Sequence, residues 1–349
     1  MSLRRVAVLE GHQETAWHVA WNPKQPLLAT CSTDRDVRMY SYAVVPGADA
    51  TFTLTDVIPT GHKRTVRYVS WAPSGDMFAT ASFDTTAGIW ECIPENDGPV
   101  WDCAGTLEGH DSECKGIEFS YNGSLLGTCS RDKSVWVWEV QPDAEFEVLN
   151  VLLEHTQDVK CVAWHPKEEI LASASYDDTI KLYIDDPSED WFCYTTLAGH
   201  SSTVWSLAFS KCGKYLASGS DDKTIRIWRR YSAAECVEKG ITPDGKVPGR
   251  AGDKWIEVHC ISGYFTRSIY SISWASDDGL GKIAAAGGDG NIVVFAIDNG
   301  PDGDTLSSHV VARVDRAHGI SDINCVAWAP HALLLASAGD DGQVHIWAM

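Results

Sequence analysis

The chain has 349 residues, and 48 acidic against 28 basic side chains give it a net charge of −20. A surface this acidic repels phosphate, which argues against direct binding to nucleic acid or to an anionic membrane. No segment approaches the ~20 consecutive apolar residues of a membrane span, and residues 1–8 lack the apolar core of a signal peptide. The sequence therefore predicts a soluble intracellular protein. Its eleven cysteines form no Cys-x-x-Cys pair, so we expect reduced thiols and neither disulfides nor a metal site.

A self-similar unit recurs along the chain. In its clearest copy, residues 199–228, Gly-His precedes the strand pattern VWSLAF, the small apolar run YLASGS, a turn with Asp, and the alternating run TIRIW. A period near 45 residues with a Gly-His start and an aromatic end is typical of WD40 repeats, which each supply four strands. The sequence thus predicts an all-β fold, a seven-bladed WD40 β-propeller of four-stranded antiparallel blades, with residues 1–349 as one domain. The copies are 11–40, 61–90, 109–138, 154–183, 199–228, 263–295 and 317–347.

Two segments stand outside the repeats. The seventh copy ends at Trp347 without a fourth strand, while the strand pattern RVAVL at 5–9 belongs to no copy. We expect this N-terminal strand to complete the last blade and close the ring, which removes exposed sheet edges. Residues 229–254 contain two Pro and four Gly, and predict an inserted exposed loop that is either mobile or in contact with a partner.

Six copies carry a His at the start of the repeat and an Asp in the turn. Six equivalent pairs around a ring predict structural hydrogen bonds, because catalysis would need one special constellation. The sixth copy has Phe265 at the His position and keeps Asp289, so we expect that blade to lack the bond. The pairs are His12–Asp34, His62–Asp84, His110–Asp132, His155–Asp177, His200–Asp222 and His318–Asp341.

Two positions vary between copies while the framework does not: the second residue of the first strand, and the residue before the turn Asp. Both should look onto one face near the propeller axis. Aromatic residues with Arg are typical of binding hot spots, and Arg binds carboxylates with two hydrogen bonds. We therefore predict a partner-binding site here, although solvated surface charges are the alternative. Its residues are the cations Arg67, Lys115, Arg131 and Lys160, partly neutralised by Glu113 and Asp158, and the aromatics Phe83, Tyr176 and Trp205.

Within these segments the chain resembles one WD40 family. The runs SRDKSVWVWEV (130–140), HTQDVK (155–160), LASASYDDTIKLY (171–183), DWFCYTTLAGH (190–200) and STVWSLAF (202–209) resemble the WD40 subunit of the cytosolic iron–sulfur protein assembly (CIA) targeting complex. The resemblance implies a non-catalytic adaptor without a cofactor of its own, in the cytoplasm and also the nucleus. Its implied partners are a MIP18-type small protein, a HEAT-repeat scaffold protein, an iron-only hydrogenase-like protein and apo iron–sulfur client proteins that receive a [4Fe–4S] cluster.

Some clients of that family end in an aromatic residue preceded by an acid. The resemblance therefore implies that Arg67, Lys115, Arg131 and Lys160 hold the carboxylates of such a tail. The aromatics Phe83, Tyr176 and Trp205 would pack against its ring. Arg131 is the strongest single candidate, because a long cation interrupts the turn inside a family-specific run.

Two other classes of function remain open from the sequence. A generic WD40 scaffold, such as a ubiquitin-ligase substrate receptor, would carry an adaptor-binding domain ahead of the propeller, and the repeats leave no room for one. A propeller enzyme would place a unique polar or metal-binding group at the axis. The sequence has no Gly-x-Ser-x-Gly, no phosphate-binding glycine loop and no His-Glu-x-x-His, so it gives no positive indication of catalysis.

Overall fold

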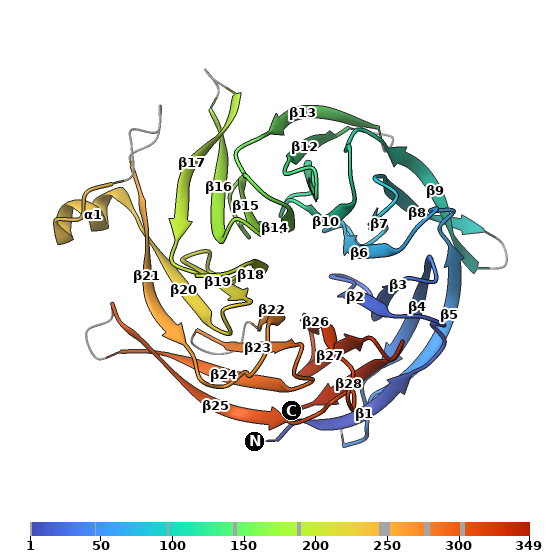
Figure 1. Cartoon of the computed structure of the whole chain (residues 1–349). Helices are drawn as coiled ribbons and strands as arrows, with labels where there is room; N and C mark the ends of the chain where they lie inside the picture. Colours follow the sequence, from blue (N-terminus) through green and yellow to red (C-terminus); the bar gives the residue numbers. More distant parts are fainter. Residues whose placement is uncertain are drawn as a thin grey trace.

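Seven four-stranded antiparallel sheets surround a central axis in the computed structural model (Figure 1). The structure describes residues 2–45, 47–95, 98–141, 145–186, 190–243, 252–275, 280–300 and 304–349. The chain passes once around the ring, and each sheet, or blade, is built from consecutive strands. The predicted seven-bladed propeller is confirmed. In this part of the chain, no helix has both the length and the apolar character needed to cross a membrane.

Blades one to four follow the repeats from the first strand near the axis to the fourth at the rim. Blade one has β2 (Ala16–Trp21), β3 (Leu27–Ser32), β4 (Asp36–Ala43) and β5 (Thr51–Pro59). Blade two has β6 (Val66–Trp71), β7 (Met77–Ser82), β8 (Ala87–Glu95) and β9 (Gly98–Leu107). Blade three has β10 (Cys114–Phe119), β11 (Leu125–Ser130), β12 (Val135–Val140) and β13 (Phe146–Leu152). Blade four has β14 (Val159–Trp164), β15 (Ile170–Ser175), β16 (Thr179–Asp186) and β17 (Asp190–Ala198).

Blades five to seven complete the ring. Blade five has β18 (Val204–Phe209), β19 (Tyr215–Ser220), β20 (Ile225–Tyr231) and β21 (Lys254–Ile261). Blade six has β22 (Ile269–Ala275), β23 (Lys282–Gly287), β24 (Ile292–Asn299) and β25 (Leu306–Val314). Blade seven has β26 (Ile323–Trp328), β27 (Leu334–Gly339) and β28 (Val344–Ala348), followed in space by β1 (Arg4–Leu9).

The two ends of the chain meet in blade seven. Strand β1 pairs antiparallel with β28, so that Arg5 lies opposite Trp347 and Leu9 opposite Val344. Both termini lie side by side in Figure 1. Leu9 is buried in the core between blades seven and one. The predicted closure by the N-terminal strand is confirmed, and it pairs an edge of β28 that would otherwise be exposed.

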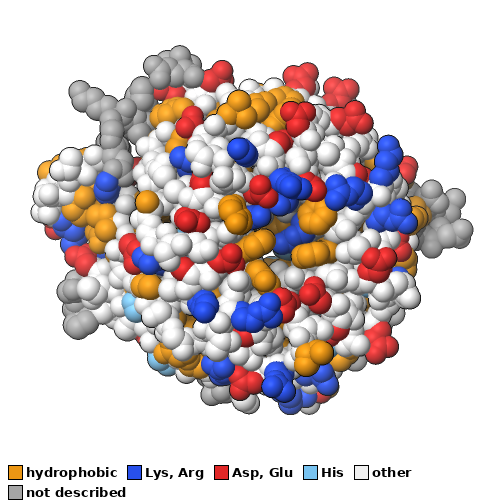
Figure 2. Space-filling model, viewed as in Figure 1, with side chains coloured by type: hydrophobic (Ala, Val, Ile, Leu, Met, Phe, Trp, Pro, Cys, Tyr) orange, Lys and Arg blue, Asp and Glu red, His pale blue; other side chains and the backbone are white. Residues whose placement is uncertain are grey.

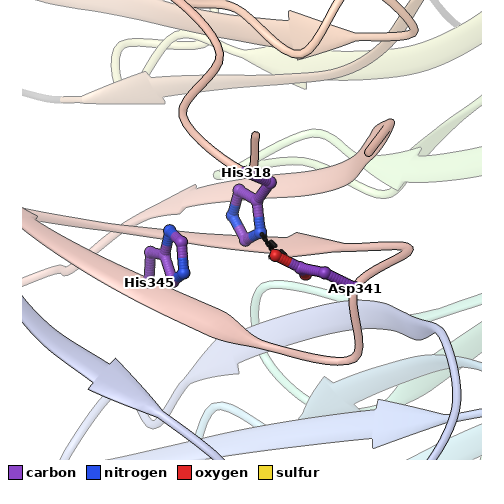
Figure 3. Close-up of side chains that lie close together, drawn as sticks. All are labelled: His318, Asp341 and His345. Carbon is purple, nitrogen blue, oxygen red and sulfur yellow. Dashed lines mark hydrogen bonds and ion pairs between the residues drawn. The ribbon is translucent and has the colours of Figure 1, made fainter. Parts of the chain in front are cut away.

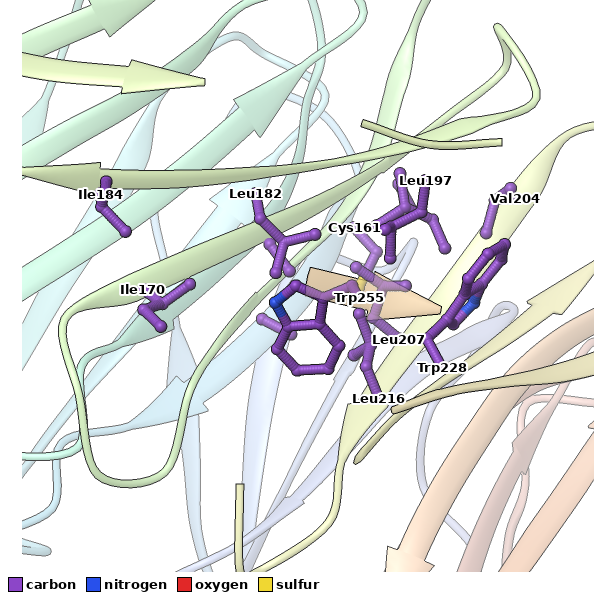
Figure 4. Packing of buried hydrophobic residues seen from close by; sticks show 14 residues of the cluster. Cys161, Ile170, Leu182, Ile184, Leu197, Val204, Leu207, Leu216, Trp228 and Trp255 are labelled. Carbon is purple, nitrogen blue, oxygen red and sulfur yellow. The ribbon is translucent and has the colours of Figure 1, made fainter. Parts of the chain in front are cut away.

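The hydrophobic core lies between neighbouring blades. Figure 4 shows the cluster between blades four and five, where Leu182 and Ile170 of one blade pack with Leu207 and Trp228 of the next. The second strand of a blade is buried on both faces, and in β15 its residues are the short run ILASAS. Small side chains are required there because the neighbouring first strand packs directly on them at close-packed density. This explains the recurring small apolar run in the sequence.

The segment 229–254 differs from the predicted exposed loop. Arg229 to Tyr231 extend β20, and a short helix, α1 (Ala233–Lys239), follows at the rim. Ser232 and Glu235 form a reciprocal capping box at its start, and Gly240 ends it in the left-handed conformation (φ 66°). The motif Ser-x-x-Glu was readable in the sequence. Residues 244–251 lie outside the described part of the chain.

Candidate partner-binding site

A β-bulge releases one residue in the first strand of every blade. In β10, the pairing with β11 moves from Cys114 directly to Gly116 and leaves Lys115 out of the ladder. A bulged residue re-aims its side chain, so this position can vary without disturbing the sheet. The bulge is the physical reason why the first variable position differs between repeats. The released residues are Trp17, Arg67, Lys115, Lys160, Trp205, Tyr270 and Asn324.

The residue before each turn Asp lies against the start of the same first strand. The Arg131 amide donates to the Glu113 carbonyl at 3.0 Å, and the Tyr176 amide donates to the Asp158 carbonyl at 2.9 Å. The equivalent backbone bond is present in all seven blades. The two variable positions of a blade are therefore neighbours on one face of the ring.

Five of the predicted site residues line one depression of about 340 Å³. Arg67 and Trp205 lie outside it and line the adjacent central channel, whose volume is about 330 Å³. Lys160 lines both spaces, so they adjoin at this side chain. Figure 2 shows Lys and Arg side chains gathered with hydrophobic side chains around the central opening. We call the depression the basic hollow; it is lined by Arg64, Phe83, Glu113, Lys115, Arg131, Gln157, Asp158, Lys160 and Tyr176.

Glu113 neutralises two cations at the outer side of the basic hollow. Its carboxylate accepts hydrogen bonds from Arg131 at 3.3 Å and from Arg64 of blade two at 3.3 Å. A hydrogen bond from the Ser112 hydroxyl, its own backbone amide and Arg131 together lower the pKa of Glu113 to about 2. The Arg131 side chain is 58% exposed. Arg131 is thus a solvated rim residue that is already paired with an anion.

Asp158 neutralises the two lysines at the inner side. Its carboxylate accepts from Lys115 of blade three at 2.8 Å and from Lys160 at 3.3 Å. Burial alone would raise the pKa of Asp158, but the two ammonium groups outweigh it and lower this pKa. Burial, with the charge of Lys115, lowers the pKa of Lys160 to about 8, although Asp158 partly offsets it. The Lys160 side chain is only 8% exposed, so its interactions are the least screened in the hollow.

A cation lies against each of the three aromatic rings of the site. The Lys160 ammonium lies 4.8 Å from the ring centre of Trp205 and 5.2 Å from that of Tyr176. The guanidinium of Arg64 lies 6.0 Å from the Phe83 ring centre. Tyr176 is 54% exposed and remains open to a ligand. The arrangement is a mixed aromatic and cationic surface, stabilised by cation–π contacts.

The sequence reasoning missed two lining residues of the basic hollow. Arg64 and Gln157 each lie two residues after the repeat's His, in the loop before the first strand. Arg64 bridges to Glu113, and its Nη1 also donates to the Phe83 carbonyl at 2.8 Å. The residue two positions after the His also varies between repeats, and this variation could have identified both residues from the sequence.

The six His–Asp pairs lie in hydrogen-bond contact, and each belongs to a larger network. His200 Nδ1 lies 2.8 Å from Asp222, its Nε2 lies 2.7 Å from the Ser218 hydroxyl, and Trp228 donates to the same hydroxyl at 3.0 Å. The network joins the loop before the first strand to the turn and to the second and third strands. The other pairs are separated by 2.9 Å (His12–Asp34), 3.1 Å (His62–Asp84), 2.9 Å (His110–Asp132), 2.8 Å (His155–Asp177) and 2.9 Å (His318–Asp341).

Blade six replaces this network by apolar packing. Phe265, Ala285 and Phe295 occupy the His, Ser and Trp positions, and all three belong to one buried cluster. Asp289 still accepts from the Thr266 amide at 3.0 Å, so only the side-chain part of the network is lost. The replacement is complete, which avoids leaving a buried polar group without a partner.

One group of three side chains has the composition of a partial metal site. His318, Asp341 and His345 offer possible ligand atoms within 4.8 Å of one another (Figure 3). Among the described residues, no other group of three such side chains lies this close together. Both His318 ring nitrogens already bond Asp341 and Ser337. Those of His345 lie 3.0 Å from the Ala317 carbonyl and 2.9 Å from the Gln343 side chain. A metal would have to displace these bonds, so the group extends the blade-seven network.

The repeats define the class of protein. The family description "WD domain, G-beta repeat" matches residues 3–41, 53–91, 101–139, 146–183, 191–229 and 310–348. The longest unmatched stretch, residues 230–309, contains most of blade six, the blade that lacks the His–Asp network. The chain is thus a WD40-repeat propeller.

Relatives narrow the family further. The chain is 50% identical to a protein of Mycosarcoma maydis named "Probable cytosolic iron-sulfur protein assembly protein 1", over all of this chain and 93% of that protein. It is 58% identical to the protein of the same name from Malassezia globosa, over 85% of this chain and 93% of the relative. For the Cryptococcus neoformans protein of that name the identity is 38% over 99% of both chains. This chain belongs to the family of cytosolic iron-sulfur protein assembly protein 1, which confirms the resemblance seen in the sequence.

Proposed function

We propose that this propeller is a non-catalytic adaptor in the assembly of cytosolic iron–sulfur proteins. It links a MIP18-type small protein, a HEAT-repeat scaffold protein and an iron-only hydrogenase-like protein, and it recognises apo clients on the face that carries the basic hollow. The names of its relatives support a role in cytosolic iron–sulfur protein assembly, and the propeller fold supports a binding role. The [4Fe–4S] cluster is cargo for the clients in this scheme.

The charge of the basic hollow is the observation that carries the proposal. Among the described residues that line the hollow, four are cations and two are carboxylates. Arg67 beside it raises the excess to three positive charges, on a protein of net charge −20. Concentrated positive charge next to exposed aromatic surface suits a ligand with carboxylates and a ring. A client tail that ends in an aromatic residue after an acid has this chemistry.

The expected contribution of each cation to ligand binding differs from the sequence-based expectation, which ranked Arg131 first. Arg131 is solvated and paired with Glu113, so its loss should cost a ligand about 1 kcal/mol or less. Lys160 is buried and shared between Asp158, Trp205 and Tyr176. Because its charge is poorly screened, Lys160 should contribute more to binding than Arg131.

A peptide titration tests the proposal. The probe is a fluorescent ten-residue peptide ending in Asp-Trp with a free carboxylate, titrated with wild type and with Lys160→Gln. We expect at least ten-fold weaker binding for Lys160→Gln. The control is Arg267→Gln on blade six, because Arg267 is a cation that pairs with an acid, Asp322, as Lys160 does with Asp158, and lines neither the hollow nor the channel. Equal affinity of wild type and Lys160→Gln would refute the assignment.

A second measurement addresses the partners. Affinity purification of the tagged full chain, followed by mass spectrometry, should recover a MIP18-type small protein and a HEAT-repeat protein. Their absence, with recovery of ubiquitin-ligase subunits in their place, would favour the generic scaffold.

A further inference from the structure

The outer strand of blade three carries an exposed aliphatic surface. Four large aliphatic side chains in or next to β13 are between 39% and 72% exposed: Val148, Leu149, Val151 and Leu153. The outer strands of blades four and five, β17 and β21, have no large hydrophobic side chain this exposed among their described residues. Figure 2 shows hydrophobic side chains with acidic ones beside them along the rim where Figure 1 places β13. Blade three therefore has an apolar rim that the two following blades lack.

Strand β13 is also an open edge of its sheet. The strand order is β10-β11-β12-β13, so β13 pairs with β12 on one side and with no described strand on the other. The free backbone N–H and C=O groups of an edge strand can pair with a strand of another chain, and Lys or Pro commonly prevents this. Residues 145–154, EFEVLNVLLE, contain neither. The segment is thus suited to the addition of a strand, the recognition mode called β-augmentation.

The pairing register places the valines of β13 on one face of the blade. Val148 lies opposite Trp138 and Val151 lies opposite Trp136, while Leu149 is the residue that the bulge leaves out of the ladder. Both indoles pack in the cluster between blades two and three. Because directly paired residues share a face of the sheet, the two valines lie on the face toward blade two. They extend that apolar cluster outward to the solvent.

Two carboxylates lie opposite each other on the other face of the same strand pair. Glu147 of β13 is paired with Glu139 of β12, one residue along from Val148. Cross-strand neighbours of this kind have Cβ atoms about 5 Å apart. Among the described residues, Glu139 accepts a hydrogen bond from the Gln141 side chain at 3.4 Å, and no cation pairs with either carboxylate. A Lys or Arg side chain from outside would therefore meet two unneutralised carboxylates.

We propose that the edge of β13 binds an extended segment of another protein in which aliphatic and basic residues alternate. The added strand pairs with β13 through backbone hydrogen bonds. Its aliphatic side chains pack beside Val148 and Val151, and its Lys or Arg side chains reach Glu139 and Glu147 on the other face. This surface shares no residue with the basic hollow, so the assignment does not depend on the proposed function.

Charge argues against a second copy of this chain as the occupant. Pairing two β13 strands edge to edge would bring the same glutamates of both copies together, on chains that each carry a net charge of −20. Like charges placed opposite each other in an interface weaken it. A basic segment of a different protein has the complementary charge.

A peptide with the alternating pattern tests the proposal. The probe is fluorescent Ser-Lys-Val-Lys-Ile-Lys-Val-Ser, capped at both ends. The control peptide, Ser-Lys-Lys-Lys-Val-Ile-Val-Ser, has the same composition and charge without the alternation. We expect wild type to bind the alternating peptide roughly ten-fold or more tightly than the control peptide. Equal binding of the two peptides, or no binding of either, would overturn the proposal.

Variants of the protein locate the binding surface. Val148→Lys/Val151→Lys should weaken binding of the alternating peptide about ten-fold, because the lysines remove the apolar contact and repel the peptide's own lysines. The matched control is Leu54→Lys/Val57→Lys, which changes two similarly exposed residues on β5, the outer strand of blade one, and should bind like wild type. Thermal melts confirm that both variants are folded. An equal loss in the two double variants, or no loss in the first, would contradict the assignment.

A second pair of variants tests the carboxylates. Glu139→Gln/Glu147→Gln should weaken binding of the alternating peptide about three- to five-fold. Glu10→Gln/Glu14→Gln removes the same amount of negative charge at exposed positions next to blade one and should leave binding unchanged. Equal effects of the two variants would show only a general attraction between a cationic peptide and an acidic protein, and would overturn the role of the two glutamates.

Two further measurements separate this proposal from its alternatives. If wild type self-associates in analytical ultracentrifugation and Val148→Lys/Val151→Lys is monomeric, the occupant is a second copy and the proposal falls. Lys160→Gln should bind the alternating peptide as wild type does, and Val148→Lys/Val151→Lys should bind the Asp-Trp peptide as wild type does. Failure at the β13 edge and failure at the basic hollow are therefore separate results.

Discussion

The ammonium group of Lys115 lies 2.8 Å from the carboxylate of Asp158, and the two residues belong to neighbouring blades. The same carboxylate holds Lys160, so one anion fixes two lysines across the boundary between blades three and four. Asp158 thereby positions the cations of the basic hollow and at the same time reduces their attraction for an acidic ligand. Asp158 therefore improves the positioning of the two lysines but weakens their attraction for an acidic ligand.

The first prediction follows from this double role. Asp158→Asn should bind the free Asp-Trp peptide about five-fold more tightly, because two lysines lose their internal counter-charge. It should also melt at a slightly lower temperature, since the bridge between blades is lost. The control is Asp322→Asn, which removes the ion pair between Asp322 of blade seven and Arg267 of blade six. This variant should leave peptide binding unchanged. Weaker peptide binding by Asp158→Asn would show that positioning outweighs charge.

The second prediction concerns pH. Lys160 has a lowered pKa of about 8, so it is charged below pH 8 and neutral above it. Acidic peptide binding should therefore weaken as the pH rises from 7 to 9. Glu118, which lines the central channel, has a pKa that burial raises to about 8; it gains a negative charge over the same range and adds to the loss. A flat wild-type profile would contradict both assignments.

Two variants separate these contributions. Lys160→Arg keeps its charge throughout and should remove most of the pH dependence. The double variant Lys160→Arg/Glu118→Gln should be flat between pH 7 and 9. The measurement is the peptide dissociation constant at constant ionic strength.

The third prediction concerns Glu118 and stability. A carboxyl whose pKa is raised on folding destabilises the folded state as the pH rises above its unfolded pKa of about 4.3. Because the channel is open to water, we expect Glu118→Gln to gain only about 1–2 kcal/mol at pH 7.5, and nothing at pH 4.5. Urea unfolding of both proteins at the two pH values measures the difference. Glu147→Gln, at an exposed position of β13, should show no gain at either pH.

The fourth prediction tests ring closure. Deleting residues 1–10 removes β1, exposes the edge of β28 and uncovers the core around Leu9. We expect the melting temperature to fall by roughly 5 °C or more. A synthetic peptide of residues 1–10 added in excess should recover part of the loss. An unchanged melting curve of the truncated chain would show that β1 does not close the ring in solution.

The fifth prediction concerns the polar network of blade five. His200→Phe alone leaves Asp222 and Ser218 without their ring partner and should cost about 2–3 kcal/mol of unfolding free energy. Adding Ser218→Ala and Trp228→Phe gives blade five the same apolar Phe, Ala and Phe side chains that blade six has at these three positions. The triple variant should therefore be more stable than His200→Phe. Additive losses across the three substitutions, measured by urea unfolding, would contradict a cooperative network.

Much of this protein was readable from its sequence. The repeats, their His and Asp positions and the unclaimed strand at 5–9 determined seven blades and their closure, because each local pattern has the period of a strand or a turn. The variable positions identified Lys115, Lys160 and their neighbours as one face. The bulge and the backbone bond before the turn Asp recur in every blade, so repeat position converts directly into spatial position.

Only the tertiary structure decided how the charges of that face are distributed. Arg67, Arg131 and Lys160 are equivalent cations in the sequence. In the fold, Arg131 is solvated and paired, Lys160 is buried between aromatic rings, and Arg67 lies at the channel without a described counter-ion. Several of these contacts come from neighbouring blades, some 45 positions away in the chain, as Asp158 is from Lys115 and Trp205 from Lys160. For that reason, the sequence could place the site, whereas the strength of each charge within it is a property of the folded ring.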